Sequence, residues 1–287
     1  MTMIVGYKKQ EVWQHNSSSE TLTGPAWLGS SVLVGLSTRR HNNGDAPHTA
    51  DRHGPGTLVS SPNTRRIGSF TPSTDRDRVS SILLQPPDAH ALLVLGHGAG
   101  TRLDHPFMHG MADALCVEGV ATFRYNYPYS EAGRGGMDAE RVRLETVCAA
   151  IDAATSAAPH LPRFAGGHSM SGRMTTLAAA QGLIENLHGL VAFAFPLHRA
   201  GHPDDIRADH LINVAFPILF VSGARDRLAD TNLLKDTIAS LNPPTALELI
   251  KDADHGFQVP KRSGRTHQDI VKEVARITAD WTSAQTT

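Results

Sequence analysis

The sequence has few cysteines, no excess of charge of either sign and no long apolar run. Only two cysteines occur among the 287 residues, Cys116 and Cys148. Because they lie far apart in sequence, neither a disulfide framework nor a cysteine-based zinc site is expected. Reduced core thiols in a cytoplasmic protein are the simpler interpretation.

The charge balance and the apolar pattern exclude two further classes of protein. The chain carries 27 Lys and Arg against 28 Asp and Glu, a formal net charge of -1, so a nucleic-acid or anionic-membrane partner is not expected. No apolar run approaches the roughly 18 residues of a membrane span. Met1 to Gly6 is too short for the apolar core of a secretory signal, and Lys8 and Lys9 follow at once. We therefore expect a cytoplasmic location.

Two regions differ in composition. Residues 1–62 are rich in Ser, Thr, Asn, Gly and His, and Val32 to Val34 is their strongest apolar cluster. We expect a flexible or loosely attached N-terminal extension. Met1 to Ile4 resembles the start of a cloning-vector β-galactosidase fragment, which predicts that the extension is partly vector-derived. Residues 63–287 are expected to form one large domain.

In this second region, predicted strands alternate with predicted helices. The alternation argues for an α/β fold with a mostly parallel, doubly wound sheet and helices on both faces. The expected strands cover 66–70, 79–84, 91–95, 120–125, 190–195, 217–221 and 246–250, and the expected helices 106–118, 139–157, 230–241 and 266–281.

The segment 163–173 predicts a short buried strand, a sharp turn and a helix, with Ser169 at the turn. A serine in this place is typical of the nucleophile elbow of an α/β-hydrolase. Strand and helix pass so closely there that the positions two before and two after must be small. Gly167 meets this demand, and Ser171 is a mild departure from G-x-S-x-G. Because such a pattern often occurs by chance, the surrounding residues must support it.

Ser169, Asp226 and His255 follow predicted strands in the chain order of an α/β-hydrolase triad. Asp226 would orient the imidazole of His255, which would take the serine proton and return it to the leaving group. Asp230 is a weaker candidate acid, because it also fits a helix N-cap. His198 is the rival histidine, and we expect it to line the substrate pocket.

The loop 96–100, Gly-His-Gly-Ala-Gly, follows the buried strand 91–95. In this fold the corresponding loop supplies one oxyanion-hole amide, and the residue after the nucleophile supplies the other. We assign these two amides to Ala99 and Met170. His97 and Gly98 are expected to line the substrate pocket.

Two alternative sites have weaker support. The glycines of loop 96–100, with Arg124 at the next strand end, could suggest a dinucleotide site, but Thr101 stands where the third glycine of G-x-G-x-x-G belongs. Two histidine pairs at i, i+4 spacing lack the glutamate of H-E-x-x-H, so structural or solvated roles are expected. These pairs are His105/His109 and His198/His202.

Several segments together resemble a known family, the small lidless α/β-hydrolases that include bacterial dienelactone-hydrolase-like proteins and relatives of the NSL-complex subunit 3. The resemblance extends over about residues 78–285, and its segments are 92–108, 123–129, 131–134, 166–170, 196–198 and 259–265. It implies an α/β-hydrolase fold without a large cap domain, and Ser169, Asp226 and His255 as the triad.

We therefore expect a serine hydrolase, a carboxylesterase that cleaves short-chain or small esters through an acyl-serine intermediate. The spacing of 57 residues from Ser169 to Asp226 leaves little room for a cap, which favours an open site and small substrates. No metal or organic cofactor is implied, because hydrolysis needs only water. A thioesterase or amidase would use the same residues, and a non-catalytic interaction module on the same fold is the alternative of a different class.

Overall fold

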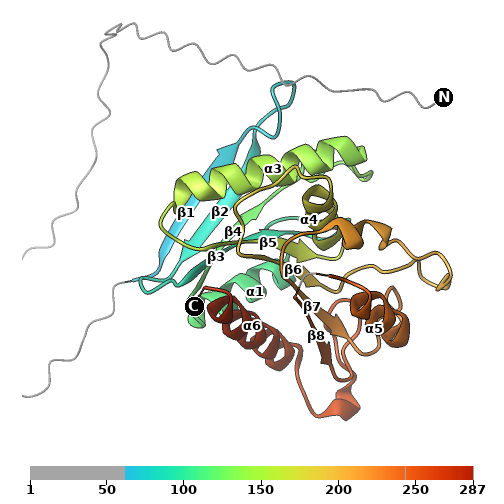
Figure 1. Cartoon of the computed structure of the whole chain (residues 1–287). Helices are drawn as coiled ribbons and strands as arrows, with labels where there is room; N and C mark the ends of the chain where they lie inside the picture. Colours follow the sequence, from blue (N-terminus) through green and yellow to red (C-terminus); the bar gives the residue numbers. More distant parts are fainter. Residues whose placement is uncertain (1–61, 243, 287) are drawn as a thin grey trace, which may run out of the picture. The chain divides into compact units, whose positions relative to one another are not determined.

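An eight-stranded sheet organises residues 62–242 and 244–286, which are the residues that the computed structural model describes. The strand order is β1-β2-β4-β3-β5-β6-β7-β8 (Figure 1). β2 pairs antiparallel with β1 and β4, and all other neighbouring strands are parallel, which confirms the predicted sheet. The strands are β1 (Thr64–Phe70), β2 (Val79–Gln85), β3 (Ala91–Gly96), β4 (Val120–Tyr125), β5 (Arg163–His168), β6 (Gly189–Phe193), β7 (Ile218–Gly223) and β8 (Thr245–Ile250). The predicted extension over residues 1–62 lies outside the described residues, except for residue 62.

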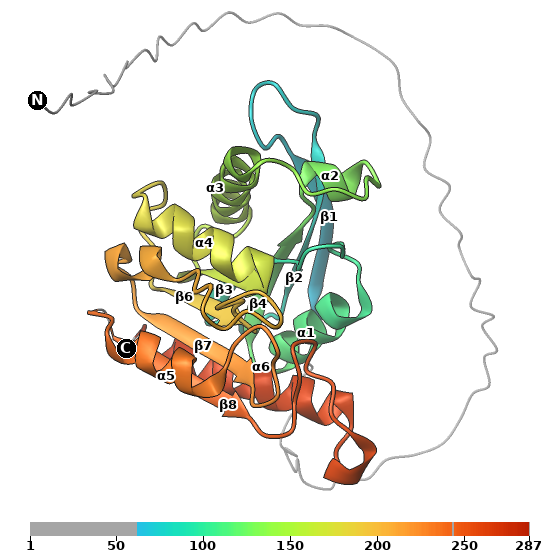
Figure 2. The ribbon, with the colours of Figure 1, turned by 90° about the vertical axis from the view of Figure 1, so that its right-hand side faces the viewer.

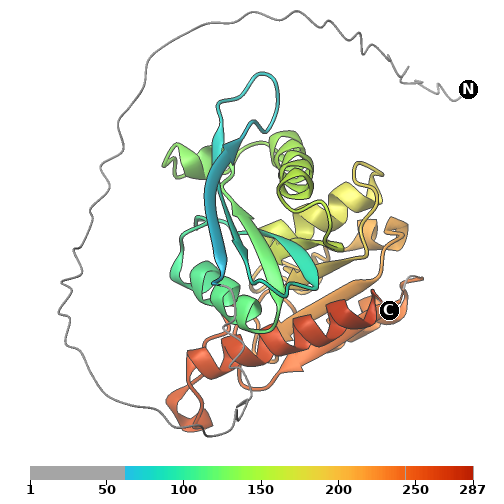
Figure 3. The ribbon, with the colours of Figure 1, turned by 90° about the vertical axis from the view of Figure 1, so that its left-hand side faces the viewer.

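Helices cover both faces of the sheet. Helices α3 and α4 lie on one face, and α1 and α6 lie on the other (Figures 1 and 2). Figure 3 shows α1 and α6 side by side on their face. The helices are α1 (Pro106–Val117), α2 (Pro128–Glu131), α3 (Glu140–Ala157), α4 (Met170–Ala180), α5 (Thr231–Ala239) and α6 (His267–Ala284), with short 3-10 helices η1 (Asp209–Asn213) and η2 (Lys261–Ser263).

The central strand β3 explains why this sheet has two cores. All six of its residues are buried. Side chains alternate along a strand, so Leu92 and Val94 join the cluster under α3 and α4, whereas Leu93 and Leu95 join the cluster under α1 and α6. A strand covered on both faces must be apolar on both, which is what the uninterrupted apolar run predicted.

Local chemistry at the element ends accounts for several of the boundaries. Thr266 caps α6 in a reciprocal capping box with Asp269, and Asp230 caps α5 by accepting from the amides of the first turn. Strand β6 ends two residues earlier than predicted, because Ala194 has a φ of +49° and turns the chain out of the extended conformation. The single-turn helix α2 was not predicted, because four residues show no periodicity.

The connection between β6 and β7 contains only one short helix, η1. The part of the chain that the structure describes therefore has no large cap domain over the carboxyl ends of the strands, as expected. Within the same residues, no helix combines the length and the apolar character that crossing a bilayer requires.

Candidate active site

Ser169 stands at a strained turn between β5 and α4. Its φ is +51° and its ψ is -108°, a backbone conformation that a residue with a side chain rarely adopts. Such strain costs on the order of 1–3 kcal/mol and persists only where the surroundings enforce it. The turn leaves Ser169 partly exposed at the N-terminus of α4.

The close packing around this turn explains how Ser171 fits where glycine is usual. A Cβ on Gly167 would come within 2.3 Å of the carbonyl oxygen of Gly96, so position 167 tolerates no side chain. A Cβ on Gly96 would come within 2.5 Å of the Ser171 side chain. The extra atoms of Ser171 thus occupy the space that Gly96, on the neighbouring strand β3, leaves free.

The three residues predicted as a triad lie within hydrogen-bond distance of one another. Ser169 Oγ is 2.9 Å from His255 Nε2, and His255 Nδ1 is 2.8 Å from Asp226 Oδ2. The carboxylate can only accept, so His255 carries its proton on Nδ1 and the serine hydroxyl donates to Nε2. The Asp226 side chain is fully buried, whereas 27% of the His255 side chain is exposed. This is the arrangement of a serine nucleophile, a base and an orienting acid.

The loops that carry the acid and the base are braced against each other. The Arg225 amide donates to the carbonyl of Ala253 at 2.8 Å, which joins the loop after β7 to the loop after β8. The second oxygen of Asp226, Oδ1, accepts from the Leu228 amide at 2.7 Å. On the other loop, Asp254 accepts from the amides of residues 256 and 258 at 3.0 and 2.9 Å. These bonds fix the backbone on both sides of the Asp226–His255 contact.

His168 has a place in the site that the sequence did not predict. Its Nε2–H donates to the backbone carbonyl of His255 at 2.9 Å, and its ring packs on Phe107 with centroids 4.9 Å apart. Burial lowers the pKa of His168 from 6.5 to about 4, so the ring is neutral at pH 7. The residue before the nucleophile therefore binds the loop of the base directly. The only signal in the sequence was its place in the elbow motif.

The loop after β3 is held from beneath by polar groups. The carbonyl of Gly98 accepts from the side chains of Thr101 at 2.9 Å and His97 at 2.8 Å, and lies 3.3 Å from the Thr101 amide. Gly100 has a φ of +73°, as the third residue of a type II turn requires. In a trans peptide the N–H and the C=O of the preceding residue point in opposite directions. The N–H of Ala99 therefore points away from the groups that donate to the Gly98 carbonyl. Ala99 is exposed, and Met170 begins α4, where the helix leaves its amide without an internal partner.

Two of the predicted pocket residues have other surroundings. His97 is fully buried, with Nδ1 at 2.8 Å from the Gly98 carbonyl and Nε2 at 3.0 Å from Ser130 Oγ. His198 is 5% exposed, and its Nε2 accepts from the Asp230 amide at 2.9 Å. Neither ring is free to line an open pocket, because each is used to join neighbouring loops. This corrects the expectation for both residues. Gly98 packs against the ring of His168, beside the elbow.

The alternative sites considered from the sequence have ordinary structural explanations. Arg124 is 1% exposed and donates to the carbonyl of Leu103 at 3.0 Å, so it supports a loop and presents no charge to a ligand. His105 caps α1 by accepting from a backbone amide, and His109 pairs with Asp113 at 2.8 Å. In the described residues, no group of three or more His, Cys, Asp and Glu side chains is placed to hold a metal ion.

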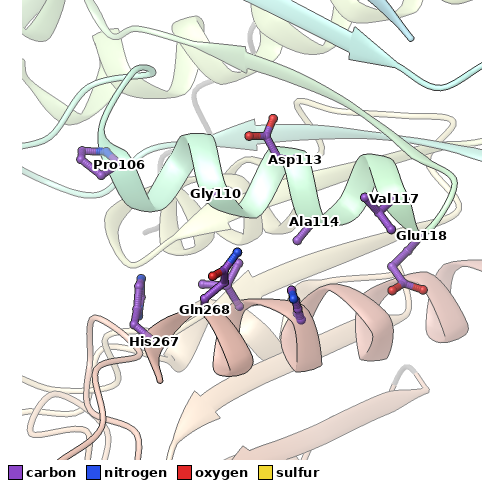
Figure 4. Close-up of a pocket in the computed structure, with 10 residues that line it drawn as sticks. Pro106, Gly110, Asp113, Ala114, Val117, Glu118, His267 and Gln268 are labelled. Atoms are coloured by element: carbon purple, nitrogen blue, oxygen red, sulfur yellow. The ribbon is translucent and has the colours of Figure 1, made fainter. Parts of the chain in front are cut away.

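A groove of about 580 Å³ lies between α1 and α6, and none of the triad residues lines it (Figure 4). Figure 4 shows Pro106 and His267 at one end and Val117 and Glu118 at the other. The groove lies between two helices on one face of the sheet. The triad lies instead at the carboxyl ends of the strands, where open α/β sheets bind ligands. The triad is therefore the candidate active site.

Comparison with known proteins agrees with this fold. A family model described as alpha/beta hydrolase domain matches residues 89–283. A dienelactone hydrolase from Anabaena variabilis is 20% identical with a TM-score of 0.61, covering 77% of this chain and 98% of that one.

Two further solved structures are similar to the same extent. Est1E from Butyrivibrio proteoclasticus is 17% identical (TM-score 0.58, 76% of this chain and 98% of that one). XC6422 from Xanthomonas campestris, described as an α/β serine hydrolase without lid, is also 17% identical (TM-score 0.57, 77% and 97%). At these identities the solved structures show the fold alone, and the family model shows the family. The chain belongs to the alpha/beta hydrolase domain family.

Proposed function

We propose that this chain is a serine hydrolase that cleaves small carboxylic esters through an acyl-serine intermediate. The observation that carries the proposal is the continuous line of hydrogen bonds from Ser169 Oγ through His255 to Asp226, at 2.9 and 2.8 Å. A hydroxyl is a weak nucleophile at neutral pH, and an adjacent base oriented by a third group is what activates it.

In the first half of the reaction, Ser169 Oγ attacks the carbonyl carbon of the ester while its proton moves to His255 Nε2. The carbonyl oxygen becomes an oxyanion, which the amides of Ala99 and Met170 are proposed to bind. The imidazolium is stabilised by the buried carboxylate of Asp226 and donates its proton to the ester oxygen of the leaving group. The C–O bond then breaks, the alcohol departs, and the acyl group stays on Ser169.

In the second half, a water molecule takes the place of the alcohol. His255 removes one proton from the water as its oxygen attacks the acyl carbon, and a second oxyanion forms in the same place. When this intermediate collapses, His255 returns the proton to Ser169 Oγ and the carboxylic acid leaves. Water is the only co-reactant, so the cycle closes with no cofactor.

The open site supports a preference for small acyl groups. The β6–β7 connection carries one short 3-10 helix, and both Ser169 and His255 keep partial exposure to solvent. A long acyl chain gains binding energy only where apolar walls enclose it, at about 25 cal/mol per Å² removed from water. We expect turnover to decrease from p-nitrophenyl acetate and butyrate to palmitate.

The test is hydrolysis of these three esters by the wild-type protein and by Ser169→Ala, together with labelling by a fluorophosphonate probe. Wild-type protein should hydrolyse the short esters and take up the probe, and the variant should do neither. Ser156→Ala is a matched control, because this exposed serine donates to the Asp152 carbonyl within α3 and lies outside the candidate site. Full activity in Ser169→Ala, or no labelling of the wild type, would refute the proposal and favour a non-catalytic module.

Three finer points belong to the same proposal. Matched ester, thioester and anilide substrates would decide which bond is cleaved fastest, because the same catalytic groups serve all three reactions. The near-neutral charge balance supports a small-molecule substrate over nucleic acid or a membrane surface. We place the reaction in the cytoplasm, because Cys116 and Cys148 are both free thiols.

A further inference from the structure

Ser171 stands where glycine is usual in the elbow motif, and its hydroxyl has two close partners. Its Oγ–H donates to the backbone carbonyl of His97 at 2.5 Å, and the same oxygen lies 2.9 Å from the hydroxyl of Tyr127. A carbonyl can only accept, so the single hydroxyl hydrogen of Ser171 belongs to the His97 bond and Tyr127 donates to Ser171. The hydroxyl of Tyr125 lies a further 3.4 Å from that of Tyr127.

This chain of hydroxyls is closed off from solvent. Ser171 and Tyr127 have no exposed surface, and Tyr125 is 1% exposed. Burial raises the pKa of Tyr127 to about 12, which keeps its hydroxyl protonated as a donor at neutral pH. A buried hydrogen bond of this kind costs more to break than an exposed one, because a lost partner is not replaced by water.

The position of the Ser171–His97 bond matters more than its strength. Ser171 is the residue after Met170, whose amide is one proposed oxyanion donor. His97 lies two residues before Ala99, whose amide is the other. Residues 97 and 171 are 74 apart in sequence, and their bond joins α4 directly to the loop after β3. It is therefore a direct polar connection between the two halves of the proposed oxyanion hole.

We propose that Ser171 is a positioning residue, whose hydroxyl, oriented by Tyr127, holds the Ala99 amide and the Met170 amide at the spacing that the oxyanion requires. This inference rests on the proposed hydrolase function. A glycine at position 171 would allow the close packing but could not make the bond, so this chain uses a device that the usual G-x-S-x-G elbow does not contain. Because the two amides act on the transition state, the bond is expected to affect kcat and to leave ester binding nearly unchanged.

The test compares Ser171→Ala with the wild type in p-nitrophenyl acetate hydrolysis and in affinity for a small alkylboronic acid. The boronic acid forms a tetrahedral adduct on Ser169 and places an oxygen where the oxyanion would lie. Displacing one oxyanion donor without removing it should lower kcat by about tenfold, less than the 10²–10³ of a donor that is lost. We expect KM to stay within about twofold and boronate affinity to fall by about the same factor as kcat.

Two further variants make the test specific. Tyr127→Phe removes the hydroxyl that donates to Ser171, together with its 3.4 Å contact to the Tyr125 hydroxyl. It should lower kcat by about threefold, because Ser171 loses the group that orients its hydroxyl. Thr175→Val is the matched control, because Thr175 lies one helical turn further along α4 and its buried hydroxyl has no hydrogen-bond partner among the described residues. Its kcat should equal that of the wild type.

The outcomes separate this inference from the proposed function. Wild-type kcat and boronate affinity in Ser171→Ala would overturn the positioning role and leave the hydrolase intact. Equal losses of kcat in Ser171→Ala and Thr175→Val would also overturn it, since they would indicate a general effect of core hydroxyls. If Ser171→Ala does not fold, Tyr127→Phe decides, and an unchanged kcat there refutes the role. Absence of activity and labelling in the wild type would instead refute the proposed function.

Discussion

His97, the buried histidine in the loop after β3, makes the stability of the protein sensitive to mild acid. His97 has no exposed surface, and burial lowers its pKa from 6.5 to about 4. In the unfolded chain the same imidazole titrates near 6.5. Between these two values the unfolded state binds more protons than the folded state, so stability falls as the pH falls. This loss of stability begins near pH 6.5 as the pH falls and is complete below about pH 4.

The size of the effect follows from the same two pKa values. Acidification from pH 7 to pH 5 should reduce the free energy of unfolding by about 2 kcal/mol through His97 alone. His168 and His210, whose pKa values burial also lowers to about 4, act in the same direction. His97 is the best residue for a quantitative test because solvent does not reach it. Against a typical total stability of about 5–15 kcal/mol, the combined loss is large.

The assay is urea unfolding followed by tryptophan fluorescence at pH 7, 6 and 5, for the wild type and for His97→Asn. Asparagine has no titrating group, so the variant should lose about 2 kcal/mol less than the wild type over this range, although it is less stable at pH 7. Parallel losses in the two proteins would show that folding does not shift the pKa of His97. The assignment of its lowered pKa to burial would then be refuted.

Three further predictions concern the triad and its support. Asp226→Asn should lower kcat on p-nitrophenyl acetate by about 10³–10⁴-fold, because His255 would lose the acceptor that fixes its tautomer, and a loss below tenfold would contradict the triad. His168→Phe keeps a ring but cannot donate to the His255 carbonyl, so kcat should fall by about fivefold while the fluorophosphonate probe still labels Ser169. A kcat equal to that of the wild type would show that His168 does not support the base. Ser169→Gly should be inactive yet raise the free energy of unfolding by about 1 kcal/mol, because glycine accepts the positive φ, and a lower melting temperature than wild type would contradict the proposed strain.

The elements of the fold follow mainly from local patterns in the sequence. The apolar run of β3 and the N-cap at Asp230 depend on residues close together in the chain, and both predicted the correct elements. The meeting of Ser169, Asp226 and His255 could also be predicted from the sequence, because the carboxyl ends of parallel strands lie at one edge of the sheet. Helix α2 and the early end of β6 were missed, because one turn of helix and one left-handed residue have no periodic signature.

The sequence by itself therefore determined the sheet, the elbow and the three side chains that meet at 2.9 and 2.8 Å. Only the tertiary structure decided what His97, His168 and Ser171 do. The partner of His168 lies 87 residues away, and that of Ser171 lies 74 residues away. A histidine or serine carries the same donors and acceptors whether it faces solvent or the interior. Burial and the identity of the group opposite fix its role, and both arise only when distant segments pack together.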